Sequence, residues 1–419
     1  MRRGATDAVM VSCGDTKSRR ACLKGLGSSG ATLPMSYAPW SSARLGEVCV
    51  RVTSGGTPST KHPEYYGGEI PWLRTQEVDF SPIYSTELSI TDEGLEKSSA
   101  KWIPQNSVII AMYGATAGRS AITKIPITTN QACCNLVVDD TKADYRFVYY
   151  SLKLRYSELE GLAKGSAQTN LSAGIIKEFE IPLPPLPIQC RIADILSAYD
   201  DLIENNRRRI AILEEAARLA YRKWLKENNN SLKSTRIGDL IELQSGFAFK
   251  SNTFVAKGKY KIITIKNVKD VVVDGENVSY VDDVPERMPQ HCYIHSGDIL
   301  LSLTGNVGRV SVSIDEDGLL NQRVAKVKSD FHWFSLLFLT STDVFCRMNN
   351  LAVGAAQQNL SPVKFCNEMF ELPERSEMAL INELVEPLFE QIVSVARFSS
   401  KLAAARDMLL PRLMKGDVA

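Results

Sequence analysis

Polar side chains that can hydrogen-bond the edges of DNA bases gather at the predicted turns of this chain. Arginine and lysine pair with guanine, asparagine and glutamine pair with adenine, and serine or threonine pairs with either. The candidates in the first half are Ser54, Thr57, Arg74, Gln76, Tyr113, Arg119, Lys124, Asn130 and Gln131. Those in the second half are Ser245, Lys266, Thr304, Asn306, Arg309, Asn321 and Gln322. The same residue types also build ordinary turns, so DNA contact and a purely structural role both stay open.

Residues typical of catalysis or metal binding form no recognisable motif. The sequence has no G-x-x-x-x-G-K-[ST] phosphate loop, no N-P-P-[FY] or D-P-P-Y tetrapeptide and no glycine-rich dinucleotide fingerprint. His291 and His295, with Cys292 between them, come nearest to a metal-ligand set, but no second Cys/His cluster accompanies them. We therefore expect this chain to have no catalytic residues and to bind no metal or cofactor.

The composition is that of an ordinary globular protein. The 49 basic and 48 acidic residues give a formal net charge of +1, so any positive charge for a polyanion must be concentrated on one surface. Nine cysteines without a C-x-x-C pair, and no apolar run long enough for a bilayer, favour a cytoplasmic protein with no membrane partner. Residues 1–36 lack periodicity, and we interpret them as a disordered tail or a mis-assigned start, with Met35 as the alternative first residue.

An internal repeat organises the chain. The segment Gly165-Ser-Ala-Gln-Thr-Asn-Leu-Ser172 matches Gly354-Ala-Ala-Gln-Gln-Asn-Leu-Ser361, and weaker matches keep the same order at a nearly constant offset. The repeat predicts two similar domains, at 40–186 and 233–373. For the two matching loops, docking of each domain on its helix is favoured over DNA contact. The docking residues would be Gln168, Asn170, Gln357 and Asn359.

Each half of the repeat closes with a long helical pattern, at 187–228 and 375–416. In both, apolar residues recur every three or four positions over roughly five heptads, which predicts that each helix buries its stripe against the other. The first stripe includes Ile192, Ile195, Tyr199, Leu202, Ile210, Leu213, Ala217, Ala220 and Trp224. The second includes Met378, Ile381, Val385, Leu388, Ile392, Val395, Leu402, Leu409 and Leu413. Pro387 should kink the second helix or split off its first turns.

Two domain-plus-helix units joined head to tail can pack their helices antiparallel. The sequence therefore predicts an α+β fold in which two mixed α/β domains are separated by two long helices that form an antiparallel coiled coil with approximate twofold symmetry. Polar residues interrupt the seam of the first helix at Asn205 and Asn206. The adjoining arginines 207–209 are interpreted as a solvated face, with contact to DNA phosphates or to a partner as the alternative.

Several of these stretches resemble the specificity subunits of type I restriction-modification enzymes. The resemblance lies in the proline-rich run 181–189, in Ile192-Ala-Asp-Ile-Leu-Ser-Ala-Tyr-Asp-Asp-Leu-Ile-Glu-Asn-Asn-Arg207, and in Met408-Leu-Leu-Pro-Arg-Leu-Met-Lys-Gly-Asp417. It extends to Leu45-Gly-Glu-Val48 and Ser54-Gly-Gly-Thr-Pro-Ser59, and so covers residues ~40–416. The second helix departs from the family pattern, because it starts without the proline-rich lead of the first.

The resemblance implies that each domain is a target-recognition domain that reads one half of a bipartite double-stranded DNA site. It also implies that the helices set the spacing and dock two methylation subunits. S-adenosylmethionine and ATP with Mg would then be bound by the methylation subunits and the restriction/translocase subunits, not by this chain. Two alternatives stay open: the recognition subunit of a bifunctional type II restriction-modification system, and a non-DNA scaffold that spaces two protein-binding domains.

Overall fold

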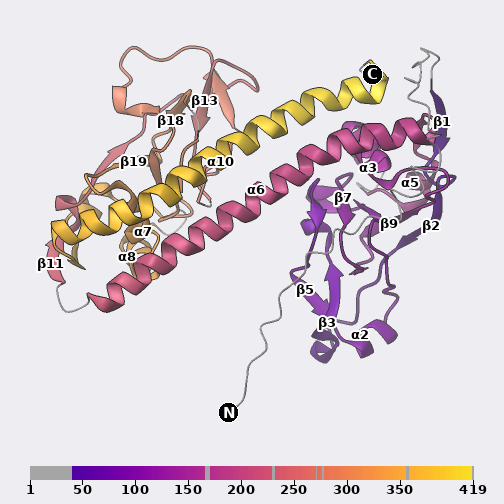
Figure 1. The fold of residues 1–419 in the computed structure, drawn as a ribbon, viewed down its shortest axis with the longest axis horizontal. Helices are drawn as coiled ribbons and strands as arrows, with labels where there is room; N and C mark the ends of the chain where they lie inside the picture. Colours follow the sequence, from indigo (N-terminus) through magenta and orange to yellow (C-terminus); the bar gives the residue numbers. More distant parts are fainter. Residues whose placement is uncertain are drawn as a thin grey trace, which may run out of the picture. The chain divides into compact units, whose positions relative to one another are not determined.

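The computed structural model describes residues 40–165, 170–228, 232–269, 271–275, 278–314, 316–354 and 358–417. The prediction for residues 1–36 lies outside these ranges. The chain divides into two compact units (Figure 1), and each contains part of both long helices. Unit 1 takes the end of the second long helix from the far end of the chain, whereas unit 2 is one continuous stretch. Unit 1 consists of Met1–Asp200 with Ala405–Ala419, and unit 2 consists of Asp201–Ala404.

Unit 1 is built around a five-stranded sheet in the order β2-β9-β6-β7-β4 and a three-stranded sheet in the order β5-β3-β8. All four residues of β6 are buried, because its two faces pack in different cores, Val108 and Ile110 in one and Ile109 and Ala111 in the other. The strands of these sheets are β2 (Cys49–Ser54), β3 (Tyr66–Leu73), β4 (Pro82–Ile83), β5 (Leu88–Ile90), β6 (Val108–Ala111), β7 (Ser120–Thr123), β8 (Thr128–Thr129) and β9 (Cys133–Val138). A separate antiparallel pair, β1 (Ser41–Arg44) with β10 (Glu180–Leu183), joins the two ends of the domain.

Helices α3, α4 and α5 of unit 1 share one main buried core with strands β6, β7 and β9. Helix α3 begins where the Asp144 carboxylate accepts hydrogen bonds from the backbone N–H groups of Arg146 and Phe147. The α-helices before the first long helix are α2 (Asp92–Glu96), α3 (Tyr145–Leu154), α4 (Tyr156–Gly165) and α5 (Ala173–Glu178). Short 3-10 turns are η1 (Pro63–Tyr65), η2 (Thr75–Glu77) and η3 (Gly114–Thr116).

Unit 2 repeats this arrangement with two four-stranded sheets, β12-β19-β16-β17 and β14-β13-β18-β15. Its strands are β11 (Lys233–Arg236), β12 (Glu242–Ser245), β13 (Tyr260–Ile263), β14 (Ser279–Val281), β15 (Tyr293–Ile294), β16 (Ile299–Ser302), β17 (Val310–Val312), β18 (Gly318–Leu320), β19 (Val324–Lys328) and β20 (Met369–Leu372). Its helices are α7 (His332–Leu339), α8 (Thr342–Leu351) and α9 (Pro362–Cys366), with 3-10 turns η5 (Ile237–Asp239), η6 (Ser251–Thr253) and η7 (Gln290–Cys292).

The pairing of strands confirms the duplication. In both units a central strand lies between two antiparallel neighbours, β6 between β9 and β7, and β16 between β19 and β17. A parallel pair also recurs, β3 with β8 and β13 with β18. The antiparallel pair that joins the domain ends is repeated too, as β1 with β10 and β11 with β20.

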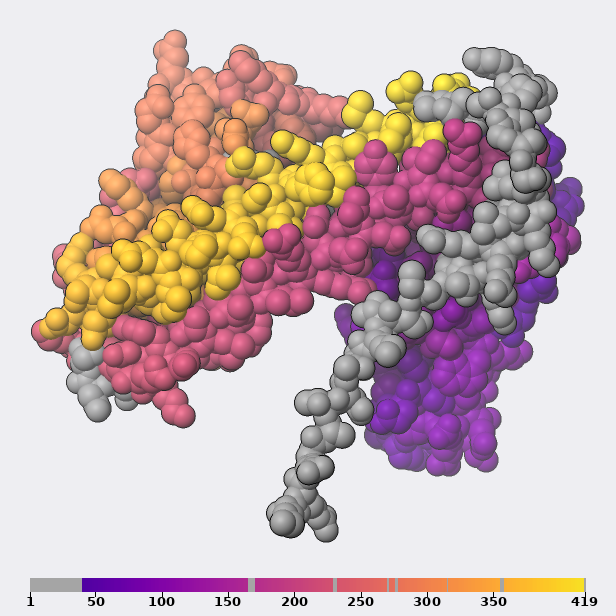
Figure 2. Space-filling model, viewed as in Figure 1, coloured from indigo at the N-terminus to yellow at the C-terminus, as the bar shows by residue number. Residues whose placement is uncertain are grey.

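Two long helices, α6 (Leu186–Glu227) and α10 (Arg375–Lys415), complete both units. In unit 1, Ile192 near the start of α6 shares a buried core with Leu413 near the end of α10. In unit 2, Tyr221 near the end of α6 shares a core with Ile381 near the start of α10. Where they pack within each unit, the two helices therefore run antiparallel, as predicted. The space-filling view shows their side chains in contact within unit 2 (Figure 2).

Two details of the predicted seam are wrong. Ile195 and Leu202 are 36% and 47% exposed, whereas Leu196 is fully buried, because the buried face at the start of α6 runs through Ile192, Ala193 and Leu196. Of the two outcomes predicted for Pro387, the split is wrong, because α10 is helical through that residue, and the kink stays a prediction. The buried side chains of Val385 and Phe389 flank Pro387 and hold the helix in place despite the hydrogen bond that proline cannot donate.

Within the ranges described above, none of the helices combines the length and the apolar character needed to cross a bilayer. The two that are long enough, α6 and α10, carry charged residues throughout their sequences.

Candidate nucleic-acid interface

In unit 1, four strand ends meet at one edge of the sheet. Ser54, the last residue of β2, pairs with Cys134 at the start of β9, and Ala111, the last residue of β6, pairs with Cys133. The backbone N–H of Asn130 donates to the carbonyl of Leu73, 2.9 Å away, which brings the end of β3 to the same turn. We call Ser54, Tyr113 and Gln131, which lie at or just beyond these ends, the first strand-end surface.

Unit 2 forms the same edge from matched strands. Ser245 ends β12 opposite Ala325 of β19, and Ser302 ends β16 opposite Val324. The backbone N–H of Asn321 donates to the carbonyl of Ile263 at 3.1 Å, as Asn130 does in unit 1. We call Ser245, Thr304 and Gln322 the second strand-end surface.

The second strand-end surface is concave. A cleft of about 450 Å³ runs across it and is lined mainly by polar groups. Its lining residues are Ser245, Leu303, Thr304, Gln322, Arg323, Asn359, Leu360 and Pro362. Thr304 is only slightly exposed, and its hydroxyl donates to Oδ1 of Asn359 at 2.9 Å. This hydrogen bond joins two residues that line the cleft. Gln322 is exposed beside it.

On the first strand-end surface, several predicted readers already have partners within the protein. The Thr57 hydroxyl donates to the side-chain carbonyl of Gln131. The guanidinium of Arg119 lies 2.6 Å from the Asp79 carboxylate. Tyr113, by contrast, is 38% exposed and projects its ring where the strand β6 ends.

The 3-10 turn after β3 lies next to this surface. The Thr116 hydroxyl in the turn after β6 donates to the carbonyl of Thr75, which ties the two turns together. Arg74 in this turn is ion-paired with Glu87. In the orientation that gives both its amide oxygen and its amide nitrogen suitable neighbours, Gln76 accepts hydrogen bonds from the guanidinium of Arg74 through its side-chain oxygen.

One predicted DNA-binding residue of unit 1 lies away from the others. Strand β7 runs antiparallel to β6, so Ser120 is at the strand-end surface and Lys124 is beyond the opposite end of the strand. The ammonium group of Lys124 lies over the ring of Tyr145, 5.9 Å from its centroid. The prediction that Lys124 joins the other readers is therefore wrong, because the direction of β7 separates them.

The remaining candidates of unit 2 lie on the turns next to the cleft. Lys266 is exposed in the turn after β13, and Asn306 and Arg309 are exposed in the turn between β16 and β17. Asn321 is half-buried, and its backbone holds the turn that also carries Gln322. Sequence reasoning therefore found the exposed polar residues of this edge, since turns between paired strands place them at the surface.

The repeated loops with Gln168 and Gln357 lie partly outside the described residues, and those two glutamines are not described. The described part has a structural role, since the backbone N–H groups of Leu171 and Leu360 donate to the carbonyls of Met112 and Leu303. The Asn359 side chain bonds Thr304 and not a residue of the long helices, so the loop fastens onto the strand end. The predicted helix docking is corrected accordingly for Asn359.

Ser172 and Ser361 follow these loops and start the next helices. The hydroxyl of Ser172 accepts from the backbone N–H of Ile175, and that of Ser361 accepts from the backbone N–H of Lys364. Asn170, the remaining docking candidate, is exposed just before the first of these helices. The N-L-S part of each repeat thus connects a strand end to a capped helix.

Three residues that sequence reasoning missed also shape these surfaces. His291, considered above only as a metal ligand, donates from Nε2 to the carbonyl of Ser245 at 2.9 Å. Arg323 lines the cleft next to Gln322, with which it is adjacent in sequence. Asp79 neutralises Arg119 from 40 positions away, and no local sequence signal marks that pair.

Two cysteines of the first sheet are held as neutral thiols. Burial is the main cause that raises the pKa of Cys134, beside the first strand-end surface, to about 12. At the opposite end of β2, burial together with the nearby Asp139 carboxylate raises the pKa of the half-buried Cys49 to about 12. A thiolate nucleophile is therefore not available at these positions near neutral pH. In the part of the chain that the structure describes, no three His, Cys, Asp or Glu side chains are grouped as metal ligands would be.

Comparison with known families gives two matches to one family model, which together cover most of the chain. The model of the type I restriction modification DNA specificity domain matches residues 37–215 and again residues 229–395. The two matched segments correspond to the two halves of the internal repeat.

Characterised relatives carry the same description. The chain is 26% identical over 407 residues to the type I restriction enzyme MjaIX specificity subunit of Methanocaldococcus jannaschii, which covers 89% of this chain and 91% of the relative. It is 31% identical over 164 residues to the EcoR124I/EcoR124II specificity subunit of Escherichia coli, covering 38% of this chain and 40% of the relative.

A solved structure supports the fold. The type I restriction-modification system S subunit from M. genitalium is similar with a TM-score of 0.56 at 17% identity, covering 91% of this chain and 98% of that chain.

Proposed function

Because the chain belongs to the type I restriction-modification DNA specificity family, we propose that its two domains each recognise one half of a bipartite double-stranded DNA site. One observation carries this proposal. Ser54, Tyr113 and Gln131 have counterparts in Ser245, Thr304 and Gln322, each pair separated by 191 positions, and each set lies at one edge of its own sheet. A duplicated reading surface suits a target with two separate halves.

The residue types at both surfaces fit reading of the DNA major groove. Glutamine can donate to and accept from adenine in a bidentate contact, and serine can donate to or accept from several bases. Gln322 is exposed at the rim of the cleft, where a base edge can approach its carboxamide. The neighbouring turns supply backbone N–H groups and cations that can position phosphates.

Substitution of the matched glutamines tests the proposal. Gln131→Ala should relax or change the methylated sequence at one half-site only, and Gln322→Ala should do so only at the other, at a cost of about 1–3 kcal/mol for the lost base contact. Single-molecule methylation mapping of cells that carry each variant is the measurement. Loss of methylation at both half-sites in either variant would mean that the glutamine is structural.

We further propose that α6 and α10 set the distance between the half-sites and dock two methylation subunits. A helix of 42 residues such as α6 is about 63 Å long, which suits a spacer of fixed length. The helices also leave large apolar side chains in solvent within unit 2. These are Ile212, Leu219, Leu380 and Leu384, all between 53% and 70% exposed. Exposed apolar side chains of this kind are typical of surfaces that a partner covers.

The chemistry of the complex is assigned to the partners in this proposal. Methylation of adenine with S-adenosylmethionine belongs to the methylation subunits, and translocation and cleavage with ATP and Mg belong to the restriction subunits. This chain supplies recognition, in keeping with relatives that are named specificity subunits. The complex would act in the cytoplasm, where the DNA is.

A further inference from the structure

The two units place different charges at matched positions beside their strand-end surfaces. Val78 and Val268 are both fully buried just after β3 and β13, and they are 190 positions apart. The parallel contacts of Pro82 with Ile122 and of Val272 with Val312 keep the same offset on both strands. Asp79 of unit 1 is therefore matched by Lys269 of unit 2, and Arg119 by Arg309.

In unit 1 the cations at these positions are neutralised. Arg119 forms an ion pair of 2.6 Å with Asp79, and Arg74 is ion-paired with Glu87 and lies 3.8 Å from Glu77. Guanidinium groups that are already paired gain little by approaching a phosphate, because a carboxylate must first be released or must also face the phosphate.

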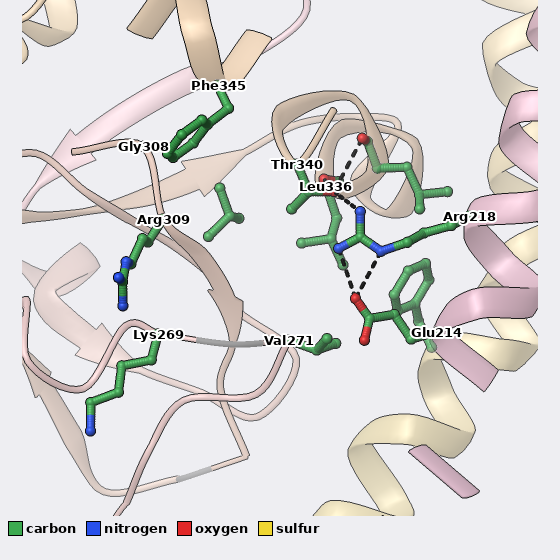
Figure 3. A pocket seen from close by; sticks show the side chains of 12 residues that line it. Glu214, Arg218, Lys269, Val271, Gly308, Arg309, Leu336, Thr340 and Phe345 are labelled. Atoms are coloured by element: carbon green, nitrogen blue, oxygen red, sulfur yellow. Dashed lines mark hydrogen bonds and ion pairs between the residues drawn. The ribbon is translucent and has the colours of Figure 1, made fainter. Parts of the chain in front are cut away.

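In unit 2 the carboxylate that would neutralise Arg309 is replaced by Lys269. Figure 3 shows both side chains on one wall of a pocket, pointing the same way and away from the Arg218–Glu214 ion pair on the opposite wall. Lys269 itself lies 2.7 Å from Asp274. Among the described residues, Arg309 and the exposed Lys266 have no carboxylate within ion-pair distance.

The turns after β3 and β13 differ in net charge as well. Residues 74–79 contain Arg74, Glu77 and Asp79, whereas the matched residues 264–269 contain the two lysines 266 and 269 and no acidic residue. The first turn therefore carries one net negative charge and the second carries two net positive charges. Since the whole chain is nearly neutral, this turn and Arg309 concentrate positive charge on one domain.

We propose that the second domain carries a phosphate-binding surface, formed by Lys266 and Arg309, that the first domain lacks. Lys269, which is paired with Asp274, contributes by standing where unit 1 has the carboxylate that neutralises its arginine. Unit 2 then supplies most of the salt-dependent affinity for DNA, and unit 1 reads its half-site mainly through uncharged or internally paired groups. This inference rests on the proposed DNA function of the two strand-end surfaces, and it divides that function unequally between them.

The salt dependence of DNA binding tests the proposal. The complex of this chain with its methylation subunits is titrated with a duplex that contains the methylated site, at salt concentrations between 50 and 200 mM. The slope of log K against log salt is negative, and Arg309→Gln and Lys266→Gln should each reduce its magnitude by about 0.9, as expected for one lost phosphate contact. Raising the salt from 50 to 200 mM should therefore weaken DNA binding by the double variant about tenfold less than it weakens binding by the wild type.

Matched variants in unit 1 serve as the comparison. Arg119→Gln should change the slope by far less than Arg309→Gln, because its charge is already paired. Asp79→Asn should free the Arg119 guanidinium for a phosphate and so increase the magnitude of the slope. Lys269→Asp should reduce that magnitude, because it places a carboxylate next to Arg309. Arg309→Lys keeps the charge and should keep the slope, which separates loss of charge from loss of folding.

The outcomes distinguish this inference from the function on which it rests. Equal slope changes for Arg119→Gln and Arg309→Gln, or no change for Arg309→Gln while site-specific binding persists, would overturn the unequal division. Wild-type complex that binds the site duplex no more tightly than a scrambled duplex would overturn the proposed function itself, and this inference with it.

Discussion

Matched residues of the two domains differ in how much of each side chain a ligand can reach. Tyr113 is 38% exposed, whereas Thr304 at the matched position is 8% exposed and bonded to Asn359. The repeat therefore keeps the backbone framework and changes the side chains presented on it. Such divergence is expected if the two domains read different base sequences, since specificity depends on individual side chains at the surface.

Residue types at turns predicted most of this surface, but not the pairs among them. Asp79 and Arg119 are 40 positions apart and meet only because the turns after β3 and β6 are adjacent. Lys124 was predicted at the surface because it follows a strand, yet the direction of β7 places it at the opposite end. Pairing and strand direction depend on tertiary structure, which a list of residue types does not contain.

A second residue-level feature concerns the attachment of α10 to unit 1. Arg406 lies 2.5 Å from Asp200 of α6, and the Tyr150 hydroxyl donates to the same carboxylate at 2.6 Å. Both charged side chains are largely buried, at 13% and 15% exposure. Burial raises the pKa of Tyr150, and the Asp200 carboxylate raises it further, so the phenol stays a hydrogen-bond donor.

Arg406→Ala should therefore destabilise unit 1 by about 3 kcal/mol, because it leaves the largely buried Asp200 carboxylate with the Tyr150 hydroxyl but without its cationic partner. Hydrogen exchange of α3 amides, measured on the full chain, reports this local loss. Arg375→Ala is the matched control on the same helix, because its pair with Asp330 is exposed and should contribute less than about 1 kcal/mol. Equal effects of the two substitutions would contradict a structural role for the buried pair.

At the scale of elements, periodicity predicted both long helices and their antiparallel packing. The helical pattern could not fix which of two neighbouring apolar residues faces the core, and so Ile195 was predicted in place of Leu196. The kink or break at Pro387 was predicted from backbone chemistry alone, whereas α10 is helical through that residue. Its continuity depends on buried neighbours such as Phe389, whose packing only the tertiary structure shows.

The exposed apolar side chains of the helices give a prediction for partner binding. Ile212 and Leu219 are seven residues apart on α6 and so lie on one face, 70% and 53% exposed. Replacement of both by serine should weaken binding of a methylation subunit about tenfold or more, because their apolar surface would no longer be buried in the complex. Thermal unfolding of the free chain should change little, since these side chains pack against few others.

Co-purification and titration of the complex measure this effect. Val353→Ser is the matched control, because Val353 is 68% exposed but lies outside both helices. If the double variant binds the methylation subunits as tightly as the wild type does, the apolar face of α6 does not dock them.

At the scale of the whole molecule, a duplicated unit of one domain and one long helix organises the chain. Two domains with matched strand pairings each take part of both long helices, and the family match repeats over both halves. The sequence predicted this organisation because repeat spacing and helical periodicity are global patterns that survive changes of individual residues. The identity of the bases read does not follow from such patterns, since it depends on the placement of single side chains against a groove.

The central claim is that the two helices space two independent readers. Deletion of one heptad from the middle of each helix removes seven residues, or about 10 Å, from both partners. Single-molecule methylation mapping of cells that carry this variant should then show both half-sites unchanged and the gap between them shorter by about three base pairs, at about 3.4 Å per pair. An unaltered gap alongside active methylation would contradict the account.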